Sequence, residues 1–457
     1  MNRSTGGSEL AVPPTVVELL DVLWAGGHSA FVVGGSLRDA LLGRTAADWD
    51  LATDARPDRV VELLPGAVYE NRFGTVAVRR DDEVYEITTF RTDHDYADFR
   101  RPHRVEFGDS IELDLARRDF TVNALAWGRT AAAAAAGVRP DLVDPFGGRD
   151  DVTSGTLRAV GEATRRFEED ALRMVRAVRL AATLGFGIEP ATLEAIAARA
   201  ELVGHLSGER VAAELGKLLA APAPSVGFRF METTGLLVHL FPELAAQRGV
   251  AQNKIPGDDL WSHTLRTVNA AAVDRPIVRV AALLHDLGKP STAADGHFYG
   301  HETVGAEMAG ALLARLRSPR VVAERVVHLV RNHMFVYESG WSDAAVRRFI
   351  GKVGQPALDE LLDLRAADNV GSGLPAHHGG LAELRTRIDE QLAAEVALQR
   401  ADLEIDGADL IAELGLEPGP IIGRLLDDLL ERVIADPELN DRPTLLLLAQ
   451  AALGDDE

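Results

Sequence analysis

The pattern of apolar and polar positions divides the chain into a mixed first part and a helical remainder. Within residues 10–150, the apolar run Phe31–Val33 ends at a glycine pair and predicts a strand that enters a turn. Leucines then recur at helical spacing up to Gly43, which predicts a helix that ends there. From Glu168 onward the pattern is almost continuously helical. Further strands are predicted at Leu51, Thr75–Arg79 and Val84–Phe90.

These patterns predict an α+β head with a small mixed sheet, followed by all-α parts. With about 150 residues per domain, a chain of 457 residues is expected to hold roughly three modules and a tail. Breaks rich in Gly and Pro interrupt the helical part, and the alanine run 131–136 is interpreted as a low-complexity insertion. The expected division is a head at 15–150, a helical neck at 151–225, a helical domain at 240–375 and an acidic helical tail at 376–457.

Composition narrows the protein class. The chain has no cysteine, which excludes disulfides and thiolate zinc sites and favours a reducing cytoplasm. Its first residues lack the apolar segment of a signal peptide. Because no apolar run approaches the roughly 20 residues that span a bilayer, no membrane association is expected.

The net charge of −22 at first argues against a nucleic-acid partner, because a phosphate backbone repels an acidic surface. The charge is uneven, however: residues 380–457 hold 6 Lys/Arg and 19 Asp/Glu and so contribute −13. Local fields matter more than total charge for docking. Basic clusters occur earlier in the chain, at Arg100, Arg101, Arg104, Arg117, Arg118, Arg165, Arg166, Arg173, Arg176 and Arg179.

A glycine turn is the first element of a candidate nucleotide site. The predicted strand leads into Gly34, Gly35, Ser36 and Arg38 at the start of the predicted helix. Backbone N–H groups at a helix start favour phosphate, glycines let the backbone approach closely, and an arginine adds a charge-assisted contact. The Gly-Lys-Ser/Thr of a Walker loop and the third glycine of a dinucleotide fingerprint are both missing.

Two aspartates follow at short spacing. On a strand, Asp48 and Asp50 would place both carboxylates on one face, with Trp49 on the other. Such a pair is a hard-oxygen site for Mg²⁺, and two Mg²⁺ ions can activate an attacking hydroxyl and stabilise a leaving pyrophosphate. Glu86, in a strand pattern, is the candidate third carboxylate. Acidic pairs are often only solvated, but the adjacent glycine turn favours the metal site.

The segment Gly34–Asp50 resembles the signature of polymerase-β-like nucleotidyltransferases, and more narrowly that of class II CCA-adding enzymes and bacterial poly(A) polymerases. Four later segments match motifs of that group in the same order: Arg117–Ala124, Asp144–Gly148, Glu169–Arg173, and Glu209–Arg210 with Glu214. The resemblance covers about residues 15–225 and implies a polymerase-β-like head. It implies ribose, triphosphate or base contacts from Arg117, Arg118, Asp119, Asn123, Asp170, Arg173, Arg176 and Arg179.

Asp170 and Arg173 are expected to read the incoming base. Three residues apart, they would be neighbours on one face of a helix. A carboxylate accepts hydrogen bonds and a guanidinium donates them, which matches the amine and ring nitrogen of cytosine and adenine and rejects uracil and guanine. The same spacing also fits an intrahelical salt bridge worth about 0.3–0.5 kcal/mol, but the surrounding motifs favour base reading.

The segment Asp95–Pro102 resembles the flexible loop that is associated, in this group of enzymes, with addition of the final A. Its usual Asp-Gly-Arg core reads Asp98–Phe99–Arg100 here. The sequence therefore leaves open whether one chain adds all three nucleotides.

A second candidate site lies in the segment Leu283–Lys289, where His285 and Asp286 are adjacent, with His263 before it and Asp368 after it. The arrangement resembles the HD phosphohydrolase superfamily, whose core metal ligands match these four residues. Imidazole and carboxylate ligands together favour Mn, Fe, Ni, Co or Mg over a soft-metal site, and a transition metal such as Ni²⁺, Co²⁺ or Mn²⁺ is expected. A metal of this kind acidifies a bound water for attack on a phosphoester.

Two further histidines, His301 and His333, are candidates for a second metal or for phosphate binding. The sequence does not determine whether this site is active. The remaining histidines are interpreted as ordinary core or surface residues: His297, His328, His377 and His378.

The combined interpretation is a cytoplasmic enzyme that adds C, C and A to the 3′ end of tRNA from CTP and ATP without a template, releasing pyrophosphate. The expected partners are tRNA and the two nucleotides, with no DNA and no membrane. The alternatives are a poly(A) polymerase or an enzyme that adds only part of CCA, an HD phosphohydrolase with a nucleotide-binding head, and a non-catalytic RNA-binding module. The aspartate pair argues against the last two, because carboxylates near phosphate weaken simple binding. The acidic tail is expected to pack on the body or to meet a partner.

Overall fold

The structure is a computed structural model that describes residues 10–46, 48–71, 74–96, 102–252, 254–394 and 396–454. The chain forms two compact units, which divide between Ala245 and Ala246. In the described part of the chain, no helix is long and apolar enough to cross a membrane. The finer four-part division stays a prediction.

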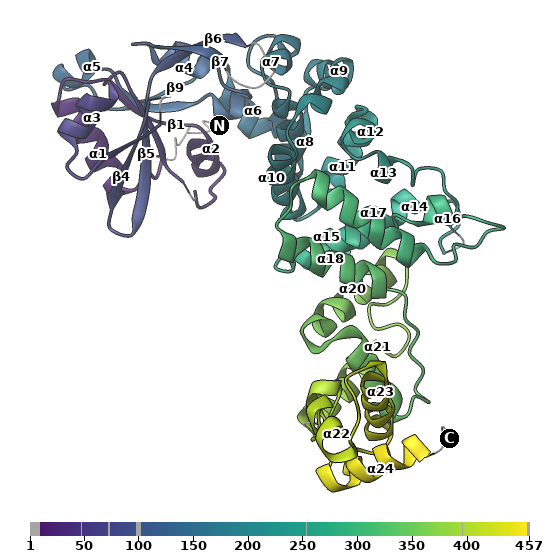
Figure 1. The fold of residues 1–457 in the computed structure, drawn as a ribbon. Coiled ribbons are helices and arrows are strands. Elements are labelled where there is room, and N and C mark those ends of the chain that lie inside the picture. Colours follow the sequence, from purple (N-terminus) through teal and green to yellow (C-terminus); the bar gives the residue numbers. More distant parts are fainter. Residues whose placement is uncertain are drawn as a thin grey trace, which may run out of the picture. The chain divides into compact units, whose positions relative to one another are not determined.

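A seven-stranded mixed sheet forms the head of the first unit (Figure 1). Its strand order is β3-β4-β5-β2-β1-β8-β9, with β2 and β5 parallel and the other described neighbours antiparallel. The predicted small mixed sheet is therefore confirmed. The strands are β1 (Ala30–Val33), β2 (Asp50–Thr53), β3 (Val68–Asn71), β4 (Thr75–Arg80), β5 (Glu83–Thr89), β8 (Ala126–Arg129) and β9 (Asp141–Val143).

Helices surround this sheet and then continue as a helical neck within the same unit (Figure 1). The head helices are α1 (Pro14–Ala25), α2 (Gly35–Leu41), α3 (Pro57–Leu63), α4 (Ile111–Ala116), α5 (Ala131–Ala135) and α6 (Gly148–Ser154). The neck helices are α7 (Ala163–Glu169), α8 (Leu172–Leu184), α9 (Pro190–Ala198), α10 (Gly208–Leu219), α11 (Pro224–Thr233), α12 (Leu236–Leu240) and α13 (Pro242–Ala245). The short pairs are β6 (Arg91–Tyr96) with β7 (Pro102–Phe107), and β10 (Thr156–Leu157) with β11 (Gly187–Ile188). The predicted loop core Asp98–Phe99–Arg100 lies outside the described residues.

The apolar run that predicted β1 is buried along its whole length, because helices and neighbouring strands cover it. Phe31 packs against Phe90 with ring centroids 6.1 Å apart, and both side chains are buried. Leu115 of α4 and Val160 belong to the same core cluster. The strand end at Val33, where the glycine turn begins, is thus held by a packed core.

Sheet register brings the glycine turn and the predicted metal carboxylates together. In the β1–β2 pair, Val33 lies opposite Asp50, so the turn starts beside that aspartate. In the parallel β2–β5 pair, Leu51 lies opposite Ile87, and both are fully buried. Because side chains alternate along a strand, the preceding residues Asp50 and Glu86 share the opposite, exposed face.

Within its described residues, the second unit is built of helices joined by loops (Figure 1). Helices α14, α15, α17, α18 and α20 pack on one another and carry the histidines and aspartates singled out above. The helices are α14 (Leu260–Ala270), α15 (Pro276–Leu284), α16 (Lys289–Thr292), α17 (His301–Arg315), α18 (Arg320–Asn332), α19 (Asp343–Val353), α20 (Leu358–Gly371), α21 (Leu381–Ala393), α22 (Gly407–Leu414), α23 (Pro420–Ala435) and α24 (Arg442–Gly454).

The acidic tail has its own small core and is also fixed to the preceding helices. Leu410, Leu429 and Leu445 are buried together. The buried Arg347 of α19 donates from Nε to the Ile434 carbonyl near the end of α23, at 2.8 Å. A guanidinium at a helix C-terminus satisfies carbonyls that have no partner within the helix. The tail therefore packs on the body of this unit.

Candidate active site and metal centre

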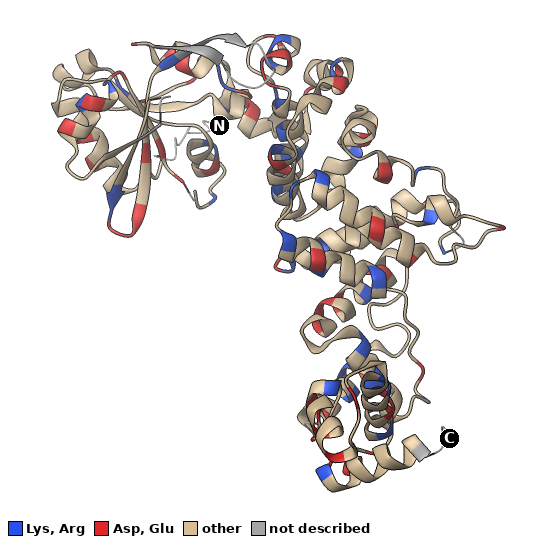
Figure 2. Cartoon of the chain, in the orientation of Figure 1, with Lys and Arg blue, Asp and Glu red and all other residues tan. Residues whose placement is uncertain are grey.

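A cavity of about 510 Å³ in the first unit gathers most of the predicted nucleotide-binding residues. Seven arginines and three aspartates line it, so the pocket is basic although the chain is acidic. Basic residues recur along α8 and α10, which contribute to this wall (Figure 2). The lining side chains and glycines are Gly34, Gly35, Arg38, Asp50, Arg117, Arg118, Asp119, Asn123, Asp170, Leu172, Arg173, Arg176, Arg179, Leu180 and Arg210.

The first glycine of the turn is required by its geometry. Gly34 has φ 87°, a conformation that favours glycine. A Cβ at this position would also lie 2.8 Å from Arg118 Nη1. The absence of a side chain therefore lets the guanidinium of Arg118 approach the turn.

Ser36 does not join the pocket as predicted. The residue is buried, and its hydroxyl donates to the Val33 carbonyl at 3.4 Å. Helix α2 begins at Gly35, so the first helical turn directs this side chain toward the end of β1. Arg38, one turn later, does line the pocket, where it donates to Asp39 and to the side-chain oxygen of Asn123.

Two of the three predicted carboxylates, Asp50 and Glu86, lie on neighbouring strands, and Asp48 lies two residues before Asp50. Asp50 begins β2, whereas Asp48 precedes the strand. The prediction that both aspartates lie on the strand is therefore wrong for Asp48. Although solvent reaches Asp50, its place in the pocket partly desolvates it and raises its pKa; Arg118 opposes this rise and the charge of Asp48 adds to it. Two like charges beside each other, with hard oxygen donors, are a chemistry that fits Mg²⁺. The pocket lining includes Asp50 but neither Asp48 nor Glu86.

Asp114 is a residue that the sequence reasoning missed. Its side chain is 1% exposed and accepts hydrogen bonds from Arg117 at 2.7 Å and from Arg118 at 3.4 Å. Burial alone would raise the pKa of Asp114, but the two guanidinium groups lower it below its ordinary value. The available signal was spacing, because an acid three and four positions before two arginines shares a helical face with them.

Asp119 connects the head to α8. Its carboxylate accepts from Arg176 Nε at 2.8 Å and from Asn123 Nδ2 at 3.1 Å. Burial opposes ionisation, but the ion pair with Arg176 and these hydrogen bonds lower the pKa of Asp119 to about 2. Glu214 of α10 in turn pairs with Arg179 at 2.8 Å and with Arg176 at 3.7 Å. The predicted binding arginines are therefore held in place by buried carboxylates.

The predicted base-reading pair is assembled differently from the expectation. Asp170 is not on a helix: it has extended φ and ψ in the link between α7 and α8, because α7 ends before it. Arg173, inside α8, pairs with Glu169 at 2.8 Å instead. The partner of Asp170 is Arg210 of α10, with Nη2 2.7 Å from Oδ2. Both predicted residues line the pocket, but among the described residues each forms its ion pair with another partner, so the intrahelical salt bridge between Asp170 and Arg173 is not formed.

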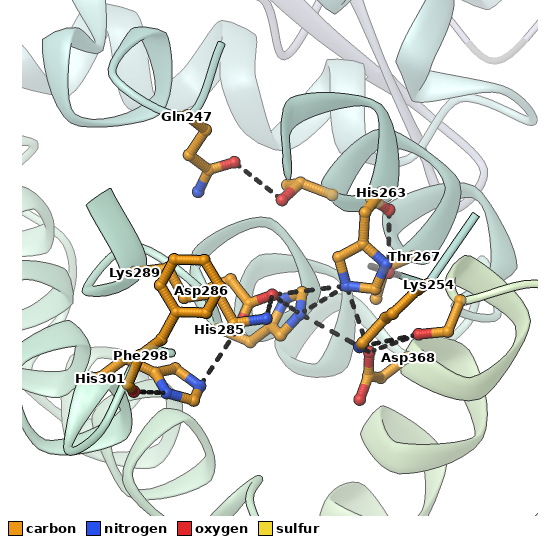
Figure 3. Close-up of polar contacts among 12 residues, drawn as sticks. Gln247, Lys254, His263, Thr267, His285, Asp286, Lys289, Phe298, His301 and Asp368 are labelled. Carbon is orange, nitrogen blue, oxygen red and sulfur yellow. Dashed lines mark hydrogen bonds and ion pairs between the residues drawn. The ribbon is translucent and has the colours of Figure 1, made fainter. Parts of the chain in front are cut away.

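The predicted HD residues converge on one buried cluster in the second unit (Figure 3). His263 Nε2 lies 3.2 Å from His285 Nε2, 3.4 Å from Asp286 Oδ2 and 3.2 Å from Asp368 Oδ1. These four side chains come from α14, the end of α15 and α20. Each is at most 5% exposed, so the cluster is a desolvated centre.

His301 and His333 face the other oxygen of Asp286. Their Nε2 atoms lie 3.4 and 3.6 Å from Asp286 Oδ1. Two groups of potential metal ligands therefore share Asp286, one with His263 and His285 and one with His301 and His333. Within the described part of the chain, Asp286 Oδ1 and both of these Nε2 atoms have no hydrogen-bond partner. Buried nitrogen and oxygen atoms that offer lone pairs but have no partner fit a site for a cation.

Backbone carbonyls fix the tautomers of three of these histidines. The Nδ1 atoms of His285, His301 and His333 lie 2.7–2.8 Å from the carbonyl three residues earlier. Since a carbonyl only accepts, each Nδ1 carries the proton and each Nε2 keeps its lone pair toward the cluster. This is the arrangement that a metal-ligating imidazole requires.

Electrostatics keep the carboxylates of the cluster ionised. Burial by itself would raise the pKa values of Asp286 and Asp368, but neighbouring His and Lys groups hold both well below the ordinary range. Burial lowers the pKa of His285. Burial also lowers the pKa of His263, but hydrogen bonds to Asp286 and Asp368 outweigh this effect and raise that pKa above its ordinary value. The donor set of imidazole nitrogen and carboxylate oxygen suits a divalent transition metal.

Known families match both units of the chain. The poly A polymerase head domain family matches residues 30–158, the family described as a probable RNA and SrmB-binding site of polymerase A matches 185–248, and the HD domain family matches 260–372. Among solved structures, the Bacillus stearothermophilus CCA-adding enzyme in complex with CTP superimposes with a TM-score of 0.73 at 28% identity, over 97% of this chain and 99% of that chain.

Curated relatives extend over nearly the whole sequence. The CCA-adding enzyme of Geobacillus kaustophilus is 33% identical over 428 residues, which is 91% of each chain. That of Lacticaseibacillus paracasei is 33% identical over 444 residues, or 95% of each chain. Similarity at this level over the full length, with the head and HD families in the same order, shows that the chain belongs to the family of CCA-adding enzymes.

Proposed function

We propose that this protein adds C, C and A to the 3′ end of tRNA from CTP and ATP, without a nucleic-acid template and with release of pyrophosphate. One observation carries the proposal: a single basic pocket holds the glycine turn, the carboxylate of Asp50 and the base-reading candidates Asp170 and Arg173. The reaction belongs to the cytoplasm, where tRNA and both nucleotides are present.

The glycine turn and the arginines are assigned to the triphosphate. The backbone N–H of Gly35 and the guanidinium of Arg118 are donors beside Asp50, whereas the N–H of Gly34 already donates to the Leu125 carbonyl at 3.2 Å. Asp114, buried behind them, fixes the orientation of Arg118, so less rotamer freedom is lost on binding. Mg²⁺ held by Asp48 and Asp50, with Glu86 as third carboxylate, would supply activation of the tRNA 3′-hydroxyl and neutralisation of pyrophosphate.

Asp170 and Arg173 are assigned to the edge of the incoming base. The Asp170 carboxylate accepts a hydrogen bond from the exocyclic amine of cytosine or adenine, and Arg173 donates to the ring nitrogen. Arg210 and Glu169 hold these two side chains. Uracil and guanine present a carbonyl where the amine would be, which would face the carboxylate and be rejected.

The deciding experiment offers the protein tRNAs that end before, within and after CCA, with each nucleoside triphosphate separately. Stepwise use of CTP twice and ATP once, with no extension of complete tRNA, supports CCA addition. Repeated ATP incorporation would identify a poly(A) polymerase instead. Extension of only one of the truncated tRNAs would identify a partial CC- or A-adding enzyme.

A second activity is favoured by the buried His/Asp cluster of the second unit. We propose that it binds a transition metal such as Ni²⁺, Co²⁺ or Mn²⁺ through His263, His285, Asp286 and Asp368, with His301 and His333 available to a second ion. Such a metal would supply an acidified water for phosphoester hydrolysis. Small phosphoesters such as 2′,3′-cyclic nucleotides are the proposed substrates. Elemental analysis of the purified chain, together with hydrolysis assays in each added metal, tests this activity separately from nucleotide addition.

A further inference from the structure

Lysine is rare in this chain, yet two lysines lie at the HD centre. The sequence contains 44 arginines and 4 lysines, so arginine supplies almost all cationic side chains. Lys254 and Lys289 each contact one carboxylate of the centre, whereas Lys217 and Lys352 are exposed helix residues. An ammonium is a compact point charge on a flexible stem, whereas a guanidinium is a planar fork. The placement indicates a role at the centre for a positive charge on a flexible stem.

Lys254 occupies the side of Asp368 that faces the imidazoles. Asp368 Oδ2 accepts from Arg365 at 3.2 Å, away from the cluster. Asp368 Oδ1 lies 3.2 Å from His263 Nε2 and 3.9 Å from His285 Nε2, and Lys254 Nζ approaches this same oxygen at 3.4 Å (Figure 3). Because the imidazole nitrogens that would ligate a metal face Oδ1, Lys254 holds the oxygen that the metal would use.

The two lysines differ in how firmly they are held. The Lys289 side chain is 8% exposed, lies 2.7 Å from Asp286 Oδ2, and packs over the ring of Phe298. The Lys254 side chain is 40% exposed and is anchored by a hydrogen bond to Ser372 Oγ at 2.9 Å. Lys289 is thus part of the buried core, whereas Lys254 can leave Asp368 by rotating its own stem toward solvent.

We propose that Lys254 is an exchangeable cation of the HD centre: its ammonium balances Asp368 while the metal site is empty, and it binds the phosphate of a phosphoester once a metal ion takes its place. An ammonium beside the same carboxylate oxygen repels a divalent ion and weakens its binding there. Displacement leaves a positive charge beside the metal, which attracts an anionic phosphate. The inference rests on the proposed phosphohydrolase function and deepens it, since it names the group that recognises the substrate phosphate.

The first measurement is metal affinity, which does not depend on activity. Metal-stripped full-length protein is titrated with Mn²⁺ by calorimetry, as wild type, Lys254→Met, Lys254→Arg and the exposed control Lys352→Met. Removal of the competing charge should tighten Mn²⁺ binding by roughly tenfold in Lys254→Met. Lys254→Arg and Lys352→Met should remain near wild type. Circular dichroism and thermal unfolding of each variant establish that it is folded.

The second measurement uses inorganic phosphate as the probe on the Mn²⁺-loaded full-length protein. Lys254→Met should bind phosphate about tenfold more weakly than wild type, because it loses one charge-assisted contact. Lys254→Arg should retain most of the affinity, and Lys352→Met all of it. Equal or weaker Mn²⁺ binding by Lys254→Met, or undiminished phosphate binding, overturns the exchange.

The two proposals fail in distinguishable ways. If Lys254→Met binds Mn²⁺ more tightly and phosphate more weakly, but the wild type hydrolyses no phosphoester, the phosphohydrolase function is wrong while the exchange by Lys254 stands. If the wild type hydrolyses phosphoesters and Lys254→Met shows neither shift, the exchange alone is wrong. A wild-type chain that takes up no Mn²⁺ overturns both.

Discussion

Arg210 Nη2 donates to Asp170 Oδ2 at 2.7 Å, although the two residues are 40 positions apart. The contact joins α10 to the extended link between α7 and α8, and it leaves Asp170 Oδ1 accepting from the Leu172 amide at 3.0 Å. Arg210 Nη1 is buried and makes no hydrogen bond within the described residues, and the residue lines the pocket. The orientation of the proposed base-reading carboxylate therefore depends on a residue from another helix.

Arg210→Met should relax nucleotide selection, because the Asp170 carboxylate loses the contact that orients it. We expect the KM for CTP and ATP to rise by roughly tenfold, the loss of one charge-assisted hydrogen bond, with detectable use of UTP or GTP. Asp170→Ala and Arg173→Ala should act in the same direction. Steady-state incorporation with each nucleotide measures this effect, with the exposed Arg229→Met of α11 as control. Unchanged selectivity in all three variants would show that these residues form only structural ion pairs.

Asp48→Asn and Asp50→Asn should abolish nucleotide transfer while tRNA still binds. Each change removes a hard anionic ligand without changing side-chain size, and transfer should fall by roughly 10³-fold or more. The measurement is single-turnover incorporation of CTP, with filter binding of tRNA alongside it. Asp58→Asn, an exposed aspartate of α3 in the same unit, is the control. Near-normal transfer by either variant would contradict the proposed two-metal site.

Asp119→Asn should destabilise the first unit in a pH-dependent manner. The folded-state pKa of Asp119 is lowered to about 2 from 3.8, so its ionised form stabilises the fold above pH 4, and this contribution is lost as pH falls toward 2. The shift corresponds to about 2 kcal/mol at neutral pH. Urea unfolding of wild type and variant at pH 7 and pH 3 should show the difference shrinking on acidification. A difference that does not change with pH would mean that packing, and not the ion pair with Arg176, is responsible.

The double variant His285→Ala with Asp286→Ala should lose the metal of the second unit and any phosphoester hydrolysis. Nucleotide addition should be largely spared, because the first unit carries its own carboxylates. Elemental analysis and hydrolysis assays with added Ni²⁺, Co²⁺ or Mn²⁺ measure the first effect, and tRNA end addition measures the second. Unchanged metal content would show that the ligands are assigned wrongly. Bound metal in the wild type without hydrolysis of any phosphoester would indicate a structural site.

Gly288→Ala should destabilise the second unit, because a Cβ there would lie 2.2 Å from the His301 carbonyl oxygen and 2.7 Å from the Gly305 amide nitrogen. Both contacts are with backbone at the start of α17, so the helix carrying His301 would have to shift, at a cost of about 1–3 kcal/mol. Gly310→Ala, within the same helix and with 3.5 Å to its nearest neighbour, should be neutral or stabilising. Thermal unfolding compares the two variants. Equal melting temperatures would contradict the close approach of the Gly288 turn and α17.

Local pattern was sufficient for the elements and for the identity of most site residues. The apolar run at Phe31–Val33, the helix that ends before Gly43 and the strand at Val84–Phe90 follow from side-chain periodicity, which depends only on near neighbours. The glycine turn, the aspartate spacing and the adjacent His285 and Asp286 are contiguous motifs. Their chemistry follows from the order of residues along the chain, and twelve of the residues predicted for the nucleotide site line one pocket.

Only the tertiary structure decided which charges face each other. Asp170 lies in an extended link and pairs with Arg210, and Asp119 pairs with Arg176, 57 positions later, because the packing of α8 brings these residues together. The pairing of Val33 with Asp50 likewise depends on strand register. In the second unit, Lys254 reaches Asp368 across 114 positions. Contacts between residues so far apart depend on how helices and strands pack, which periodicity and motif spacing do not encode.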